Sequence, residues 1–192
     1  MQSIKKITKQ LIKRFKKIRF EWVYRVAFVI FTIAAEFIPP SEFLLNRILV
    51  DFSAHFVQNF LVSHIILGEF TFWNVWVPFL ASALDIDHFI AASSLSFVKA
   101  TSLEQQAPFH NLALPIVILC LAGIFLYNNQ KTLYDNFLAL SLCLFVHLCR
   151  DGLRRGVAFC SYRSSPLPFS IYLLVVFTHV FLLEFLYKLS LN

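Results

Sequence analysis

The 192-residue chain is poor in charge and in cysteine. Charged residues make up 15% of it, whereas 58% of the residues are hydrophobic and 23 are Phe. Its four cysteines form no recognisable disulfide framework, and three of them fall in apolar segments, where a free Cys behaves as a small hydrophobe. A soluble domain of this length cannot bury so much apolar surface. The composition therefore predicts an α-helical protein that spans a membrane.

Acidic residues are missing between Lys5 and Arg19, a stretch that holds eight of the 17 Lys and Arg residues. The nine remaining basic residues are outnumbered by the 11 acidic ones, so nucleic-acid binding is not implied. Apolar residues recur at helical spacing in the basic stretch, which predicts an amphipathic helix over residues 1–20 that lies on anionic lipid headgroups. The alternative is a mitochondrial presequence. A secretory signal is disfavoured, because the sequence around Pro39 offers no small-residue cleavage site.

Six apolar segments follow, each near the ~17–25 residues that a spanning helix requires. They cover residues 22–38, 43–67, 71–92, 111–127, 134–149 and 169–187. Glu36 near the end of the first segment and Pro78 inside the third mean that neither is a simple span. We expect an all-α, polytopic membrane bundle of about six transmembrane helices, formed by a single domain over residues 21–192 after the N-terminal arm of residues 1–20.

Ionisable residues recur at the ends of these segments, although each one held in hydrocarbon costs about 2.5–3.5 kcal/mol. If the second to fifth helices each cross once, the starts of the second and fourth and the ends of the third and fifth lie at one membrane face. The sequence therefore predicts one polar site at that face. Its residues are Asp51, His55, Asp85, Asp87, His88, His110, His147 and Asp151.

The spacing of these residues suits metal binding. Residues four apart share a helix face, so Asp51 with His55, and His147 with Asp151, can each form a ligand pair. A mixed carboxylate and imidazole set suits zinc, manganese or ferrous iron. Eight candidates exceed one tetrahedral shell, which leaves either two ions ~3.5–4 Å apart or one ion with supporting groups and a general base.

The roles divide as follows. The expected metal ligands are Asp85, Asp87, His88, His110, His147 and Asp151. The expected catalytic groups are Asp51, His55 and Asp87, of which Asp87 points away from Asp85 unless the helix unwinds there. The clustered arginines Arg150, Arg154 and Arg155 suit an anionic substrate, or else they anchor a cytoplasmic loop. Each His–Asp pair alone is also explained by an intrahelical hydrogen bond. His64 and His179 are expected to be packing or interfacial residues, and Glu184 to snorkel.

With these residues in view, the chain resembles the transmembrane protein 267 family over roughly residues 25–175. The resemblance rests on Ala83–Phe89, Pro108–His110, His147–Arg154 and Ser164–Phe169, with the Asp51 and His55 pair fitting as well. It implies a polytopic membrane protein and no particular chemistry.

A more distant resemblance is to the bacterial inner-membrane metal-dependent hydrolase family. Its ordered pattern of a D-x-D-H motif, a histidine-rich H-R-x-x-T-H segment and an H-x-x-x-D helix end is matched by six residues. They are Asp85, Asp87, His88, His110, His147 and Asp151. The chain departs from this pattern at Gln105 and Gln106, where the resemblance implies a histidine and an arginine.

The sequence therefore predicts an integral, multi-pass membrane protein in the lipid bilayer, with a metal-dependent hydrolase activity on a lipid or other anionic substrate. One alternative is a non-enzymatic membrane scaffold whose polar cluster is structural or holds a structural metal. Another is a transporter that uses the carboxylates as an ion path.

Overall fold

The chain is almost entirely helical in the computed structural model, which describes residues 21–37, 44–68, 71–94, 96, 99–100, 103 and 107–190. The predicted basic helix over residues 1–20 lies outside the described residues, as do Gln105 and Gln106. A helix over residues 21–35 comes first. It is followed by α2 (Leu44–Leu67), α3 (Trp73–Ser82), the short 3₁₀ helix η1 (Ala83–Asp85), α4 (Ile86–Ala91), α6 (Ala113–Tyr127), α7 (Lys131–Arg155) and α8 (Phe169–Ser190). An antiparallel hairpin of β1 (Ala158–Phe159) and β2 (Tyr162–Arg163) joins α7 to α8.

Helix boundaries follow local chemistry. Gly68 and Gly156 end α2 and α7 with positive φ angles of 72° and 77°, which glycine adopts without a Cβ penalty. Asn129, with a φ of 57°, turns the chain between α6 and α7. Pro115 is tolerated because it lies in the first turn of α6, where backbone N–H groups have no helical partner.

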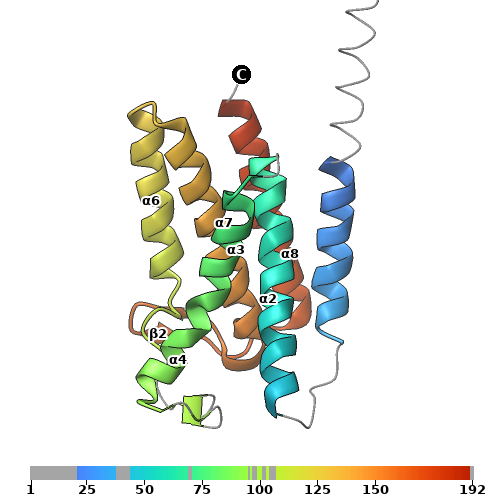
Figure 1. Cartoon of the computed structure of the whole chain (residues 1–192), viewed down its shortest axis with the longest axis vertical. Helices are drawn as coiled ribbons and strands as arrows, with labels where there is room; N and C mark the ends of the chain where they lie inside the picture. The colour runs from blue at the N-terminus through green and yellow to red at the C-terminus, as the bar shows by residue number, and fades with distance from the viewer. Residues whose placement is uncertain are drawn as a thin grey trace, which may run out of the picture.

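Successive long helices run in opposite directions, so the bundle has two distinct ends (Figure 1). The start of α2, the end of α3, the start of α6 and the end of α7 lie together at the end that carries α4 and the hairpin (Figure 1). We call this the site end. The alternation expected from the sequence is therefore present. The connections from α2 to α3 and from α6 to α7 are short, which forces the helices of each pair to run antiparallel.

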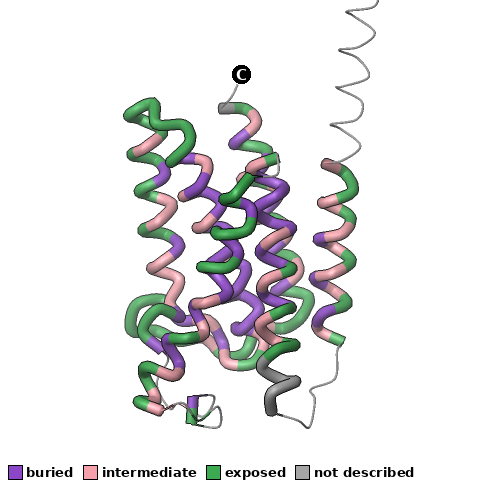
Figure 2. Tube along the Cα trace, in the orientation of Figure 1, coloured by how far each residue is buried: buried purple, intermediate pink, exposed green. Residues whose placement is uncertain are grey.

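The core is centred on α7, which packs against α2, α3, α6 and α8. Its middle is buried on most sides, with Leu142, Cys143 and Val146 fully enclosed. Figure 2 shows buried positions concentrated along α2 and α7, while the helix over residues 21–35 exposes much of its surface. Val62 of α2 and Val176 of α8 complete this apolar centre.

Polar side chains also join the helices within the bundle. Gln58 on α2 donates from its amide to Thr32 Oγ1 at 3.0 Å and to the Tyr172 hydroxyl at 2.9 Å. Asn59 donates to Ser82 Oγ at 3.2 Å, which fixes the end of α3. Helices surrounded by lipid gain little from the hydrophobic effect when they associate, so hydrogen bonds of this kind help to hold them together.

Two of the described helices are long and apolar enough to cross a membrane: Lys131–Arg155 and Phe169–Leu189. The expected count of six spanning helices is not supported by the described part of the chain. Helix α3 has only 10 residues, because Ala83 begins a 3₁₀ turn, and α6 has 15, about 22 Å of length against a hydrocarbon core of ~30 Å. Helix α2 reaches 24 residues but carries a row of polar groups.

Candidate metal centre

His110 is the centre of the polar site. It lies in the loop before α6, is 2% exposed, and is flanked by carboxylates on both sides of its ring. Its Nδ1 lies 2.9 Å from Asp87 Oδ1, although the two atoms are not aligned for a linear hydrogen bond. Its Nε2 lies 3.3 Å from Asp85 Oδ1 and 3.2 Å from Asp151 Oδ2. Three carboxylates therefore converge on one imidazole.

The change from η1 to α4 explains how Asp85 and Asp87 both reach this ring. Residues two apart point to nearly opposite sides of a regular α-helix. Here Asp85 closes the 3₁₀ turn and Asp87 opens the following helix, so the two side chains flank the ring. The backbone N–H of Phe109 donates to Asp87 Oδ2 at 2.8 Å and holds that carboxylate in place. The sequence predicted that Asp87 would point away from Asp85 unless the helix lost its regular form there. The 3₁₀ turn of η1 interrupts the α-helix at this point, and both carboxylates reach His110.

Helix α7 contributes the second half of the site. His147 Nε2 lies 3.4 Å from His110 Nε2, 3.4 Å from Asp85 Oδ1 and 3.7 Å from Asp151 Oδ2. His55 of α2 stacks on His147 with a centroid separation of 3.9 Å and directs its Nε2 toward Asp151 Oδ1 at 3.4 Å. Both imidazoles are fully buried.

These separations match the geometry of a metal site. A tetrahedral zinc ion with ligands at ~2.0–2.1 Å holds its ligand atoms about 3.3–3.4 Å apart. His110 Nε2, His147 Nε2 and Asp85 Oδ1 form a triangle with sides of 3.4, 3.4 and 3.3 Å, close to one face of such a tetrahedron. Asp151 Oδ2 is near enough to supply a fourth ligand. The buried Nδ1 and Nε2 atoms of His55 and Nδ1 of His147 have no hydrogen-bond partner, so this centre has unused ligand capacity.

The donors form two overlapping groups. Asp85, His88, His110 and Asp151 can bring ligand atoms within 4.8 Å of one another, and so can His55, Asp85 and His147. Asp85 belongs to both groups. The geometry therefore accommodates either one ion or two ions that share Asp85, as the number of candidate ligands in the sequence suggested.

A small pocket opens on the first group. Its lining includes the candidate ligands His88, His110 and Asp151 together with Arg155 and Arg163. His88 lies 3.4 Å from the Arg155 guanidinium, and the Arg163 Nε donates to the backbone carbonyl of Arg155 at 2.8 Å. Two cationic side chains thus border the metal-ligand cluster at the surface of the site end.

The charges around His110 and His88 have opposite effects on the two rings. Burial alone lowers the pKa of His110, but hydrogen bonds to Asp151, Asp85 and Asp87 outweigh it and raise that pKa to about 11. Burial, then the neighbouring His110 and Arg155, lower the pKa of His88 to about 4. The carboxylate side of the site attracts a positive charge, and the arginine side repels one.

Asp51 has different neighbours from those its spacing suggested. It pairs with Arg154 at 3.1 Å and lies 3.6 Å from Arg150, while His55 faces Asp151. Among the described residues, Asp51 contributes no atom to either donor group. The interpretation of Asp51 and His55 as one ligand pair therefore has no geometric support, because the arginines of α7 attract the carboxylate.

The three predicted substrate arginines occupy different environments. Arg150 is buried and donates from Nε to Glu36 Oε1 at 2.7 Å. Arg154 bridges Asp51 and Asp151, with both contacts at 3.1 Å. Arg155 lines the pocket instead. Only Arg155 of the three therefore borders the pocket beside His88.

Two residues at this end were not predicted from the sequence. Glu36 was treated as an awkward residue of the first segment, although extending the count of crossings to that helix would have placed it at the site end. Arg163 reaches the pocket through the hairpin, whose Ala158 and Arg163 are paired across the strands. No sequence spacing indicated that contact.

The remaining histidines take part in packing, as predicted. His64 lies 4.0 Å from the Tyr24 ring, and His179 stacks on Phe145 at 3.9 Å. Glu184 is buried and pairs with Arg25 and Lys188, so its charge is neutralised locally and does not depend on snorkelling.

Antiparallel apolar helices with a buried Asp/His cluster at one end define a multi-pass, integral membrane protein with a polar site. Comparison with known proteins agrees with a membrane protein, because the similar proteins are named transmembrane proteins. Transmembrane protein 267 of Xenopus laevis is 33% identical over 151 residues, which cover 73% of this chain and 68% of that protein. The Bos taurus protein of the same name is 37% identical over 103 residues, or 50% and 46% of the two chains. The Danio rerio protein is 31% identical over 141 residues, or 69% and 63%.

The chain therefore belongs to the transmembrane protein 267 family, as the sequence resemblance indicated. No protein-family model matches it, and no solved structure gives a significant match.

Proposed function

We propose that this protein is a metal-dependent hydrolase that acts at the membrane surface on a lipid or other anionic substrate. The observation that carries the proposal is the triangle of His110 Nε2, His147 Nε2 and Asp85 Oδ1, with sides of 3.3 to 3.4 Å. Ligand atoms at that separation, drawn from three elements far apart in the sequence, fit one face of a zinc tetrahedron. The mixed imidazole and carboxylate set also suits manganese or ferrous iron.

The residues have distinct roles in this proposal. Asp85, His110, His147 and Asp151 hold the first ion, and a second ion would lie on one side of it, with His88 beside His110 and Asp151 or with His55 beside His147. Asp87 keeps the proton on His110 Nδ1, so that Nε2 is free to bind, and the Phe109 N–H fixes Asp87. When bound, a divalent ion supplies a Lewis acid and lowers the pKa of water to about 7, which suits hydrolysis.

The substrate class is argued from the two arginines at the pocket, because its volume of about 10 Å³ has room for one water molecule and a substrate would meet these arginines at the pocket mouth. Arg155 and Arg163 border it and can bind the oxygens of a phosphate or carboxylate. The pocket also lies at one end of a bundle that spans the bilayer, where lipid headgroups are the most abundant anionic groups. We therefore propose a phosphate-bearing lipid headgroup or a similar anion, recognised by Arg155 and Arg163.

A structural role is the second candidate, and ion pairs favour it. Arg150 joins Glu36 to Asp51, and Arg154 joins Asp51 to Asp151, so the end of the first helix, α2 and α7 are linked at the site end. The glutamines at positions 105 and 106 also stand where the bacterial resemblance implies a histidine and an arginine, so a metal-ligating imidazole and a cationic guanidinium are missing. A scaffold that retained the fold and a structural metal would have both features.

The test combines metal content with turnover. Detergent-purified protein is analysed by elemental mass spectrometry beside the double variant His110→Ala/Asp151→Asn. We expect one or two equivalents of a transition metal, lost in a variant that still elutes as a monodisperse particle. Hydrolysis of bis(p-nitrophenyl) phosphate after chelation and reloading with zinc or manganese then separates the candidates. A metal-bound protein without turnover supports the scaffold, and a metal-free protein unaffected by chelators contradicts the metal site.

A further inference from the structure

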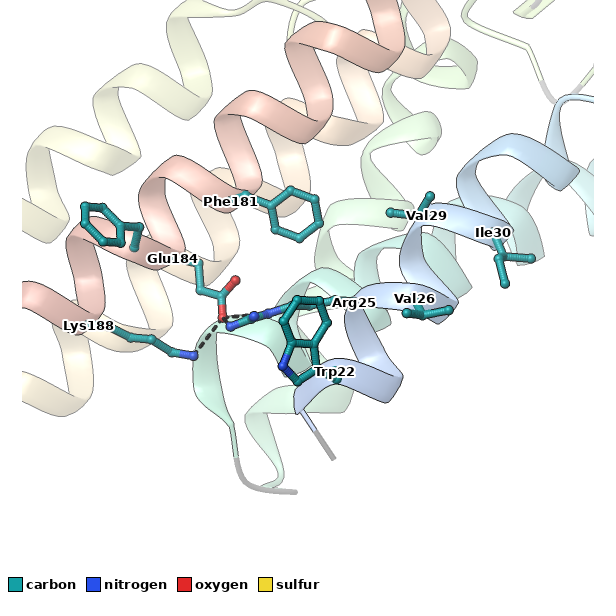
Figure 3. Close-up of a pocket in the computed structure, with 9 residues that line it drawn as sticks. Trp22, Arg25, Val26, Val29, Ile30, Phe181, Glu184 and Lys188 are labelled. Atoms are coloured by element: carbon teal, nitrogen blue, oxygen red, sulfur yellow. Dashed lines mark hydrogen bonds and ion pairs between the residues drawn. The ribbon is translucent and has the colours of Figure 1, made fainter. Parts of the chain in front are cut away.

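A second cavity lies far from the Asp/His site, between the helix over residues 21–35 and α8 (Figure 3). Its volume of about 490 Å³ falls within the ~300–1,000 Å³ range of ligand pockets. Figure 1 shows that the start of the helix over residues 21–35 and the end of α8 both lie at the end of the bundle opposite the site end. The lining residues are Trp22, Arg25, Val26, Val29, Ile30, Phe181, Glu184, Phe185 and Lys188.

One end of this groove is charged. Glu184 is 4% exposed, and its Oε1 accepts from Arg25 Nε at 3.2 Å and lies 2.8 Å from Lys188 Nζ. Lys188 also pairs with Glu21 at 2.8 Å. The dashed contacts in Figure 3 show Arg25 and Lys188 approaching Glu184 from the two helices. Two cations and two carboxylates leave this cluster with no net charge.

The rest of the groove is apolar and open to the bilayer. Val26 and Ile30 of the first helix and Phe185 of α8 are each more than half exposed. Helix α8 is a candidate span, and only 22% of its most apolar part is buried inside the protein, compared with 61% for α7. Most of α8 therefore faces outward. The medium around such a surface is hydrocarbon, so a lipid chain is the natural occupant of the groove.

We propose that this groove binds one zwitterionic phospholipid of the surrounding membrane. Its acyl chain lies along Val26, Ile30 and Phe181, and its headgroup lies beside the charged cluster. The phosphate faces Arg25 and Lys188, and the ammonium faces Glu21. A cluster with both signs complements a headgroup with both signs, whereas a purely anionic headgroup makes no use of the carboxylate of Glu21, which is 27% exposed. Trp22, which packs under the Arg25 guanidinium at 5.1 Å, is suited to the headgroup level.

The occupancy test uses the full chain in nanodiscs of equal parts phosphatidylethanolamine and phosphatidylglycerol, extracted gently and examined by native mass spectrometry. The wild type is expected to retain one phosphatidylethanolamine. Val26→Trp fills the groove and should reduce the lipid-bound fraction at least tenfold. The matched control is Leu174→Trp, because Leu174 is 65% exposed on α8 and lies outside the groove. Equal lipid retention in both variants, or none in the wild type, overturns the site.

The headgroup assignment is tested separately. Replacing the ion pair with Arg25→Leu/Glu184→Leu leaves no buried charge unpaired, so the variant should fold and keep a lipid. Because Glu21 and Lys188 remain, its preference for phosphatidylethanolamine over phosphatidylglycerol should be weakened and not abolished, and an unchanged preference contradicts the role given to Arg25. A wild type that retains phosphatidylglycerol overturns the headgroup class, and a second copy of the chain in place of lipid overturns the proposed occupant. Neither result depends on metal content or turnover.

Discussion

Replacing Asp87 with Asn should weaken metal binding without abolishing it. Asp87 lies 2.9 Å from His110 Nδ1 and accepts the Phe109 N–H at 2.8 Å, but it belongs to neither group of potential ligands. An Asn side chain has one acceptor oxygen and can satisfy only one of these two donors, and it loses the negative charge. Outer-shell substitutions of this kind cost about 10–100-fold in metal affinity, or ~1.4–2.7 kcal/mol.

Metal binding by Asp87→Asn is best compared with metal binding by Asp85→Asn. Asp85 Oδ1 is one corner of the ligand triangle, so its loss should eliminate stoichiometric binding. The assay is a competition titration of Zn²⁺ against a chelating dye in detergent, with Asp135→Asn as the control, because Asp135 pairs with Lys131 at the opposite end of the bundle. The reasoning fails if Asp87→Asn binds as tightly as the wild type, or loses the metal as completely as Asp85→Asn.

Three further substitutions have defined outcomes. Gly156→Ala places a Cβ 2.0 Å from the Ser164 carbonyl oxygen at a φ of 77°, so the melting temperature in detergent should fall by several degrees. The control is Gly68→Ala, which has a similar φ but open space around the new Cβ, and it should show only the backbone strain of about 1 kcal/mol. Gln58→Leu removes two hydrogen bonds between helices, to Thr32 and Tyr172, and should cost about 0.6–1.7 kcal/mol for each in the same melting experiment. Asp51→Asn should leave metal stoichiometry unchanged in elemental analysis, since Asp51 pairs with arginines and lies outside both donor groups; a loss of metal would show that Asp51 is a ligand.

Alternating helix directions, counted from the sequence, predicted that the Asp and His residues would gather at one end of the bundle, and most of them do. Short breaks at Gly68 and Asn129 compel antiparallel neighbours, so residues distant in the chain meet at one end without any knowledge of packing. Most helix ranges also followed the predicted apolar segments closely. The exception was residues 71–92, where composition cannot distinguish a continuous helix from α3, η1 and α4, because the break depends on a few backbone angles.

Side-chain partners were less predictable, because they depend on other helices. Asp51 and His55 share a helix face, but Arg154 attracts one and Asp151 the other. Arg150 looked like a substrate group until Glu36 proved to be its partner. Helical periodicity shows which residues lie on the same face of one helix. It does not show which charged residues of other helices pack against that face, and these decide the ion-pair partner.

The distribution of charge between the two ends predicts how the protein is oriented. Of the 17 Lys and Arg residues, eight precede residue 21 in the sequence, and Arg25, Lys131 and Lys188 lie at the end of the bundle opposite the site. The other six are Arg47, Lys99, Arg150, Arg154, Arg155 and Arg163. Arg150 and Arg154 of those six are engaged by carboxylates. The positive-inside rule therefore predicts that the N-terminus is cytoplasmic and that the Asp/His site faces away from the cytoplasm. Cys160 is exposed in the site-end hairpin and allows a direct measurement. A membrane-impermeant maleimide should label it from the side opposite to an N-terminal epitope tag, and Cys160→Ser should abolish that label. Labelling from the same side as the tag would mean that the two ends do not lie across the bilayer from one another.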